Sequence, residues 1–131
     1  MRLLLDTNVL LWWLSDHSTL PGRAREIIAD PGNDLLVSSA SVWEITIKAG
    51  LGRIEIELNH LEEAILKSGF QPLLISFRHA LGVGRLPDVH RDPFDRILVA
   101  QARVEKLRIL SHDRVFERYG LRTEGLDPII V

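Results

Sequence analysis

Near the start of the chain stands the stretch LLLDTNVLLWWL, an apolar run interrupted at its centre by Asp6, Thr7 and Asn8. An unpaired carboxylate costs several kcal/mol when it is buried, so a single apolar element cannot run through the whole stretch. The stretch instead predicts a buried strand over residues 3–5, a turn at Asp6, and a helix over residues 9–14. Asp6 then either caps the helix or binds a partner from outside the chain.

Short apolar runs followed by helical segments recur along the rest of the chain. The runs at Leu35–Val37 and Arg108–Leu110 predict buried strands. Further extended segments are predicted at Arg53–Glu57, Pro72–Ile75 and Leu126–Val131. Helices are predicted at residues 21–29, 38–50, 61–68, 77–83, 93–107 and 113–119. Because strands alternate with helices, the pattern indicates an α/β sandwich with a mostly parallel sheet.

The composition narrows the class of protein. With 131 residues, 46% of them hydrophobic and 26% charged, the chain suits one globular domain over residues 1–131. Cysteine is absent, which excludes disulfides and thiolate metal sites and fits a cytoplasmic protein. No segment approaches the roughly 18 apolar residues that span a membrane, so no membrane partner is expected. The net charge of −2 counts mildly against a nucleic-acid-binding domain.

Polar side chains follow two of the predicted strands. Asp6 follows the strand at residues 3–5, and Ser111 and Asp113 follow the strand Arg108–Leu110. Because ligands of parallel sheets bind beyond the carboxyl ends of the strands, we expect these side chains at one functional edge. Asp113, like Asp6, either caps the helix after it or binds a ligand.

A third carboxylate, Asp95, stands in the first turn of the helix that begins at Pro93. Asp92 is the expected N-cap of that helix, because proline favours the first helical position. Asp95 instead shares its helix face with apolar residues such as Leu98 and Val99. The helix N-terminus balances part of its charge, and a cation would balance more.

Glu44 has two structural interpretations on sequence alone. The spacing Ser41-x-x-Glu44 is that of a capping box, and Lys48 stands four residues later, as in a surface ion pair. Both features favour a structural role for Glu44.

Together, the carboxylates favour a hard divalent cation, because Mg²⁺ and Mn²⁺ prefer oxygen ligands. No cysteine cluster or histidine pair at ligand spacing indicates a softer metal. The five histidines are scattered, and most are expected at the surface. His112 lies beside Asp113, and its side chain either faces the site or points away.

Four segments, in this order, resemble the motifs of PIN-domain ribonucleases, and most of all the toxin subunits of VapBC-type toxin–antitoxin pairs. They are LLLDTNVLLW with Asp6, SASVWEITIKAGLGRI with Glu44, DPFDRILVAQA with Asp95 and ILSHD with Asp113. The resemblance covers nearly the whole chain. It implies a PIN-like three-layer α/β/α sandwich and a Mg²⁺- or Mn²⁺-dependent endoribonuclease that acts on RNA.

The resemblance also implies site residues and partners. The family's acidic quartet, which binds metal and carries catalysis, matches Asp6, Glu44, Asp95 and Asp113, and its supporting positions match Thr7, Asn8 and Ser111. Many relatives have threonine where this chain has Ser111, so the hydroxyl is kept. The cation would activate a water for attack on the phosphodiester, with Glu44 as a ligand through water or as general base. The implied partners are a small VapB-like antitoxin and a second copy of the chain.

Basic side chains near the motifs are candidates for phosphate contacts, although a solvated surface role is the commoner one for each. They are Lys48, Arg53, Arg85, Arg91 and Arg96. Arg96 is the strongest candidate because it neighbours Asp95, and Lys48 is the second candidate for an RNA contact.

The three tryptophans have three possible roles: core, RNA stacking or protein interface. Trp12 and Trp13 are adjacent in a predicted helix, so they cannot face the same way. At least one of them is therefore expected to leave the main core, and that surface suits a partner protein.

Three rival functions have acidic sites of similar composition. A phosphoacceptor receiver domain needs an aspartate after a middle strand, but Leu35–Val37 leads into Ser38 and Ser39. Hydrolases with an aspartyl-phosphate intermediate need D-x-D after the first strand, but position 8 is Asn. The remaining alternative is a catalytically inactive PIN-like scaffold that acts as a binding module, against which the intact quartet argues.

Overall fold

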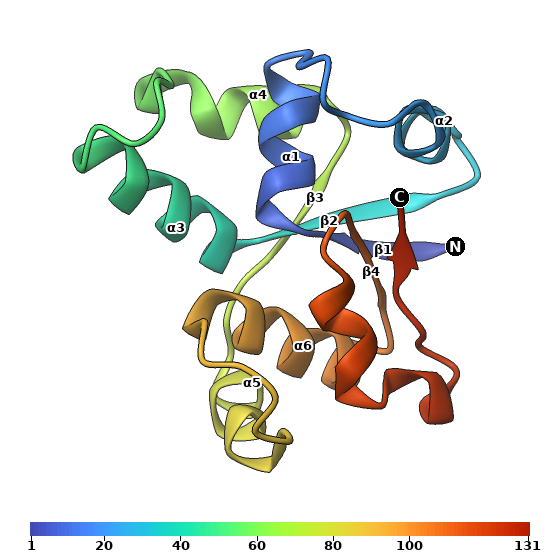
Figure 1. The fold of residues 1–131 in the computed structure, drawn as a ribbon. Helices are drawn as coiled ribbons and strands as arrows, with labels where there is room; N and C mark the ends of the chain where they lie inside the picture. The colour runs from blue at the N-terminus through green and yellow to red at the C-terminus, as the bar shows by residue number, and fades with distance from the viewer.

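Five short strands pair in parallel to form one sheet in the computed structural model, which describes residues 1–131 (Figure 1). The strands are β1 (Arg2–Leu5), β2 (Asp34–Ser38), β3 (Gln71–Leu73), β4 (Arg108–Ser111) and β5 (Ile129–Ile130). Their order in the sheet is β3-β2-β1-β4-β5, and every pairing is parallel. The prediction of a mostly parallel sheet is confirmed.

Helices connect the strands and cover both faces of the sheet. The α-helices are α1 (Thr7–Leu14), α2 (Gly22–Ala29), α3 (Ser39–Gly50), α4 (Leu61–Lys67), α5 (Phe77–Gly82) and α6 (Pro93–Glu105). The 3₁₀ helices are η1 (Leu58–His60), η2 (Val83–Arg85), η3 (Arg114–Tyr119) and η4 (Leu121–Glu124). Helices α1–α4 lie on one side of the sheet and α5 and α6 on the other (Figure 1), which gives the α/β/α sandwich.

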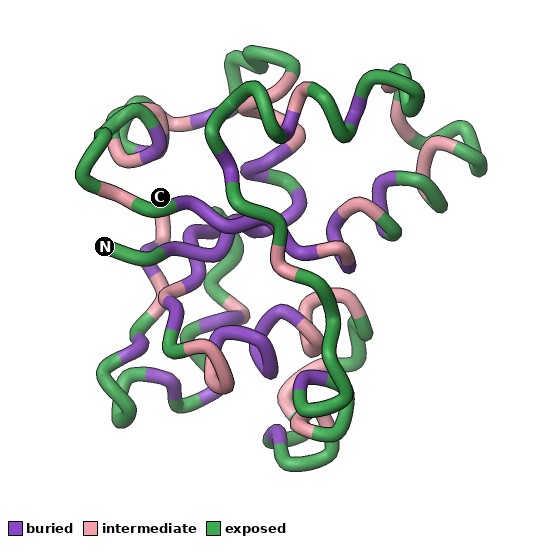
Figure 2. The backbone as a smooth tube through the Cα atoms, turned by 180° about the vertical axis from the view of Figure 1, so that it is seen from behind, coloured by how far each residue is buried: buried purple, intermediate pink, exposed green.

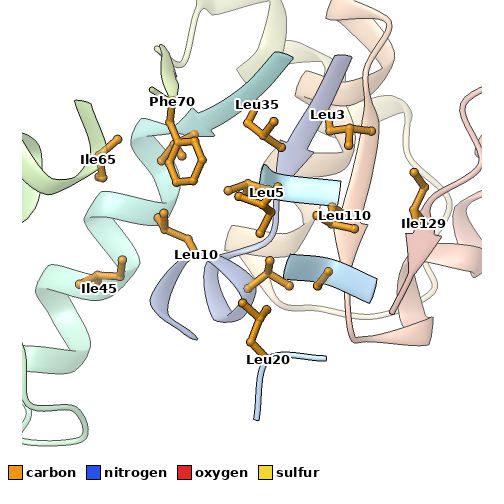
Figure 3. Close-up of a cluster of buried hydrophobic side chains, with 14 of the residues drawn as sticks. Leu3, Leu5, Leu10, Leu20, Leu35, Ile45, Ile65, Phe70, Leu110 and Ile129 are labelled. Carbon is orange, nitrogen blue, oxygen red and sulfur yellow. The ribbon is translucent and has the colours of Figure 1, made fainter. Parts of the chain in front are cut away.

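Successive side chains of β1 point to opposite faces of the sheet, and each face has its own hydrophobic cluster. Leu3 and Leu5 face the cluster formed with α1–α4, which Figure 3 shows around Leu10, whereas Leu4 faces the cluster formed with α6. All three leucines of β1 are fully buried. In Figure 2 the strands form the buried centre of the chain and the outer helix faces are exposed. Burial on both sides is why the predicted strands read as continuous apolar runs.

The direction of the helices places their termini at opposite edges of the sheet. Helix α1 begins at Thr7, directly after β1, so its N-terminus lies at the carboxyl edge. Helix α6 leads into β4, so its C-terminus lies at the amino edge and its N-terminus at the carboxyl edge. The backbone N–H of Asp6 donates to the carbonyl of Leu110 at 3.0 Å, which joins the ends of β1 and β4.

Most predicted elements are confirmed, and three predictions need correction. Arg53–Glu57 forms no strand, because it pairs with no other segment. Leu126–Val131 contributes only the two residues of β5, and the helix predicted at 113–119 is the 3₁₀ helix η3. None of the helices combines the length and the hydropathy that a membrane span requires.

Candidate acidic site at the carboxyl edge of the sheet

Asp6 is held at the carboxyl edge by neutral donors only. It is the N-cap of α1, and its Oδ1 accepts from the N–H of Thr7 at 2.7 Å. Its Oδ2 accepts from the Ser111 hydroxyl, also at 2.7 Å, at the end of β4. The residue is only 5% exposed. Asp6 therefore caps a helix, and it is also a buried carboxylate with no cationic partner.

Thr7 connects α1 with α3. Its hydroxyl donates to the buried hydroxyl of Ser41 at 2.9 Å. The N-cap of α3 is Ser38, whose side chain accepts from the N–H of Ala40. The capping box expected from Ser41 and Glu44 is therefore wrong, because α3 begins at Ser39, one residue after its cap.

Glu44 faces inward from α3 and is 7% exposed. Its Oε2 lies 2.7 Å from Nζ of Lys48, so the predicted i,i+4 pair is present. Because the Glu44 side chain is buried, this pair is not the surface pair expected from the sequence. Lys48 is less accessible to a phosphate than an unpaired lysine would be, since its ammonium already contacts a carboxylate.

Asp95 lies in the first turn of α6 but does not cap the helix. The cap is Asp92, whose Oδ1 accepts from the N–H groups of Phe94 and Asp95, as predicted. The Oδ2 of Asp95 instead lies 3.1 Å from Nε2 of His90. The other ring nitrogen of His90 contacts the hydroxyl of Tyr119. His90 thus fixes the position of the Asp95 carboxylate, and Tyr119 fixes the orientation of the His90 ring.

Arg96 is used within the loop that carries His90. Its Nη1 donates to the carbonyls of Pro87 and His90 and, at 3.4 Å, to the hydroxyl of Tyr119. The guanidinium therefore orders the segment that positions His90. A phosphate contact by Arg96 remains a prediction.

Asp113 differs from the other three acids because it is exposed. Its Oδ1 accepts from the N–H of Val115 at 2.9 Å and caps η3. Its own N–H donates to the Ser111 hydroxyl, which in turn donates to Asp6. Ser111 thus links the backbone at Asp113 to the carboxylate of Asp6. The ring of His112 turns away, toward Trp12 and the carbonyl of Val131.

Asn8 points away from the buried acids. It is exposed and lines a cleft of about 630 Å³ between α1 and the segment 54–64, beside Trp12. Trp12 is half-buried in this cleft, and Trp13 packs on Phe70. The two tryptophans face different ways, as predicted.

Burial and like charges raise the pKa values of Asp6 and Asp95. Burial raises the pKa of Asp6 to about 7; the charges of Asp95 and Glu44 add to the rise, and hydrogen bonds from Ser111 and Thr7 oppose it. Burial also raises the pKa of Asp95 to about 6, with Asp92 and Glu44 adding and His90 opposing. The carboxylates of Asp6, Glu44 and Asp95 therefore lie within range of one another's charge.

The donor set fits a hard cation, although the side chains do not converge on one point. No group of three or more His, Asp or Glu side chains is arranged to hold an ion. Each acid is satisfied by a partner within the chain: Asp6 by Ser111, Glu44 by Lys48, Asp95 by His90 and Asp113 by Val115. Among the partners of Asp6, Glu44 and Asp95, Lys48 is the one lysine or arginine, so this cluster holds three carboxyl groups beside a single permanent cation.

Several residues of this edge were not identified from the sequence. The expectation that most histidines lie at the surface is confirmed, because three of the five are exposed. His90 is only partly exposed, and His79 is buried at the far end of α6, where it pairs with Glu105. The His90 spacing, two residues before the Asp92 cap and five before Asp95, is the only signal that could have indicated its contact. Tyr119 lies 24 residues beyond Asp95, and no local pattern indicates that it reaches this loop.

The comparisons with known proteins agree with this architecture. Residues 3–121 match the PIN domain family. The chain belongs to the PIN domain family. No curated protein matches the sequence.

Solved structures with the fold of this PIN domain include chains of three VapBC complexes. The DNA-bound VapBC of Salmonella typhimurium has a TM-score of 0.67 at 17% identity, covering 98% of this chain and 96% of that one. VapBC2 of Rickettsia felis, bound to a promoter DNA fragment, has a TM-score of 0.65 at 14% identity, covering 100% and 98%. VapBC-1 of nontypeable Haemophilus influenzae has a TM-score of 0.62 at 19% identity, covering 99% and 98%. At these identities the likeness establishes the fold.

Proposed function

We propose that this PIN domain is a Mg²⁺- or Mn²⁺-dependent endoribonuclease and the toxin of a toxin–antitoxin pair. The observation that carries the proposal is the cluster of Asp6, Glu44 and Asp95 at the carboxyl edge of a parallel sheet. Burial, with a further contribution from neighbouring negative charges, raises the pKa values of Asp6 and Asp95, and Asp6 has no cationic partner. A site of this kind suits a cation that brings a phosphodiester to the carboxylates.

Each residue of the edge has a stated part in the proposal. Asp6, Glu44, Asp95 and Asp113 would hold the cation, whose positive charge would offset the negative charge of the phosphate and lower the pKa of an attacking water. Ser111 and Thr7 fix the carboxylate of Asp6 through the hydroxyl and N–H bonds already present. Glu44, which now pairs with Lys48, would act either as a ligand through water or as the base that accepts a proton from the attacking water.

The proposal includes partners. Because the solved neighbours are VapBC complexes, we propose that a small VapB-like antitoxin binds this chain in the cytoplasm. We also propose that residues 1–131 act as one nuclease domain and form a homodimer. Inspection of the neighbouring gene for a small antitoxin, followed by co-expression and copurification of its product with this chain, tests the antitoxin. Sedimentation of the purified chain tests the dimer.

The direct test is incubation of the purified chain with structured RNAs in Mg²⁺, in Mn²⁺ and in chelator, followed by mapping of the cut ends. We expect discrete cuts that require the cation. A folded chain that binds RNA but never cuts it would instead support the inactive scaffold.

The chemistry of the cut ends tests the attacking group. We propose that water attacks, because the acidic cluster presents carboxylates, and His90, the histidine beside it, is bonded to Asp95 and Tyr119. An RNA with 2′-deoxyribose at the cut position should still be cleaved. Products that end in a 2′,3′-cyclic phosphate would show that the 2′-hydroxyl attacks and would contradict this mechanism.

A further inference from the structure

A second charged site lies at the other end of α6. A cavity of about 390 Å³ opens between α5–η2 and the C-terminal half of α6. Small and apolar residues line part of it, and a Cβ added at Gly82 would lie 3.6 Å from the Cβ of Ala100 and 3.9 Å from a methyl group of Val104. Four cationic side chains line it, and they are Arg78, Arg85, Arg103 and Lys106, against one carboxylate, Glu124.

Most of this positive charge is unbalanced within the chain. Arg103 pairs with Glu124, with Nε 3.1 Å from Oε2. Arg78, Arg85 and Lys106 are exposed and form no ion pair. The side chains that line the cavity therefore carry a net charge of about +3. Cationic clefts with low-dielectric walls concentrate the electric field and attract anions.

Two of these cations occupy unfavourable positions: the backbone conformation disfavours Lys106, and the helix dipole disfavours Arg78. Lys106 adopts φ 59° and ψ 52°, the left-handed conformation that ends helices and favours glycine. A side chain there costs about 1 kcal/mol relative to glycine. Arg78 stands in the first turn of α5, at the positive end of the helix dipole. The α6 dipole favours Lys106 and Arg103 but not Arg78, so capping alone does not account for the cluster.

We propose that this cavity binds phosphate groups, with the guanidinium groups of Arg78 and Arg85 as the main donors. Arginine's planar fork matches phosphate oxygens. The two arginines are seven residues apart on one face of α5–η2, about 11 Å along the axis, which suits two phosphates of a chain better than one free ion.

The RNA backbone is the source of phosphate that fits this span, and that part rests on the proposed function. From Asp95 to Arg103 is about 12 Å along α6, so an RNA chain longer than a few nucleotides reaches both ends of the helix. The acidic end would hold the bond to be cut, and the basic cavity would hold phosphates beyond it. Free inorganic phosphate is the other source of the same chemistry.

The experiment measures binding in chelator, where cleavage plays no part. The test variant is Arg78→Gln with Arg85→Gln, and the matched control is Arg23→Gln with Lys67→Gln, which removes two exposed cations elsewhere. Fluorescence anisotropy follows a short oligouridylate and one long enough to span α6, across a salt series. Calorimetry follows inorganic phosphate. Lys106→Gly serves as a third variant.

We expect the test variant to bind the long RNA several-fold more weakly, with the slope of log affinity against log salt smaller by about 1.4. The control and the short RNA should change little. Lys106→Gly should weaken long-RNA binding while raising the melting temperature. Loss of phosphate binding alone would assign the cavity to the free ion. If neither RNA nor phosphate binding differs between test and control, the proposal is wrong, whether or not the wild type cuts RNA.

Discussion

The two ends of α6 carry opposite charges in opposite settings. Its first turn holds Asp95, which lies beside Asp6 and Glu44 in a buried cluster. Its last turn and cap hold Arg103 and Lys106 at an open cavity. The helix dipole favours both placements. Burial distinguishes them: desolvation raises the pKa of Asp95 to about 6, so this end is strained without a cation, whereas water solvates the other end.

The largest effect should follow from neutralising the buried end. Asp6→Asn or Asp95→Asn should lower RNA cleavage by roughly three orders of magnitude, since several kcal/mol of transition-state stabilisation is lost. Asp113→Asn should also nearly abolish cleavage while η3 persists, because asparagine caps a helix as well as aspartate does. Single-turnover rates and circular dichroism measure both. Folded variants that cleave at the wild-type rate would place the site elsewhere.

Stability should respond next, and its sign depends on pH. The pKa of Asp95 is about 6 in the folded protein against 3.8 ordinarily, so the folded state holds the proton more tightly. Ionising Asp95 in the folded state therefore costs stability. This cost is absent below about pH 4, grows as the pH rises to about 6, and is constant above that pH. Asp95→Asn removes it. Relative to wild type, the metal-free variant should therefore gain up to about 3 kcal/mol in free energy of unfolding between pH 4 and pH 7.

A metal titration separates this interpretation from a capping role. In wild type, Mg²⁺ or Mn²⁺ at 100 times its dissociation constant should raise the free energy of unfolding by about 2.7 kcal/mol. The increase should be smaller in Asp95→Asn. Thermal melts of both proteins, in chelator and in excess metal, measure the four values. If metal shifts neither melt and the variant is the less stable protein at pH 7, then Asp95 stabilises the fold and the acids share no cation.

The α/β/α layers and the place of the acids at the carboxyl edge of the sheet could be predicted from the sequence. The contacts that the acidic side chains make at that edge could not. The apolar runs of β1, β2 and β4 and the Asp92–Pro93 start of α6 follow local rules, and the structure agrees with them. The short β5 and the irregular Arg53–Glu57 depend on pairing partners that no local pattern reveals. The partners of Glu44 and Asp95 depend on which face each helix turns inward. For that reason the Glu44 pair was expected at the surface.

His90 offers a smaller, sharper test of the buried end. His90→Ala removes the side chain that holds Asp95, so the affinity for Mn²⁺ should fall roughly tenfold. Free Mn²⁺ measured by electron paramagnetic resonance reports this without any RNA. His90→Gln should recover part of the affinity, because an amide can still donate to Asp95. Tyr119→Phe, which loses only the contact behind His90, should have a weaker effect than His90→Ala. Equal Mn²⁺ affinity in all three would show that His90 does not position Asp95.

The smallest effect should come from Trp43, which stands beside the acids without being buried. Trp43 is 59% exposed and follows Val42 on α3, next to Glu44, and its ring meets Phe94 edge-on at 5.2 Å. Phe94 precedes Asp95, so the aromatic pair bridges α3 and α6 at the acidic end. An exposed indole there suits stacking with a base of the RNA. Trp43→Ala should raise the KM for RNA several-fold and leave kcat nearly unchanged.

A measurement of the free energy of unfolding controls for the apolar contact that Trp43→Ala also removes. The edge-on pair with Phe94 is worth about 1 kcal/mol beyond the apolar area it buries, so Trp43→Ala should lower the free energy of unfolding by at least about 1 kcal/mol. Leu66→Ala, at a comparably exposed site on α4, should change neither KM nor kcat. If Trp43→Ala lowers kcat and the affinity for Mn²⁺ instead, the indole acts by holding α3 against α6. The acidic end would then depend on Trp43 for its geometry, as it does on His90, and not for contact with RNA.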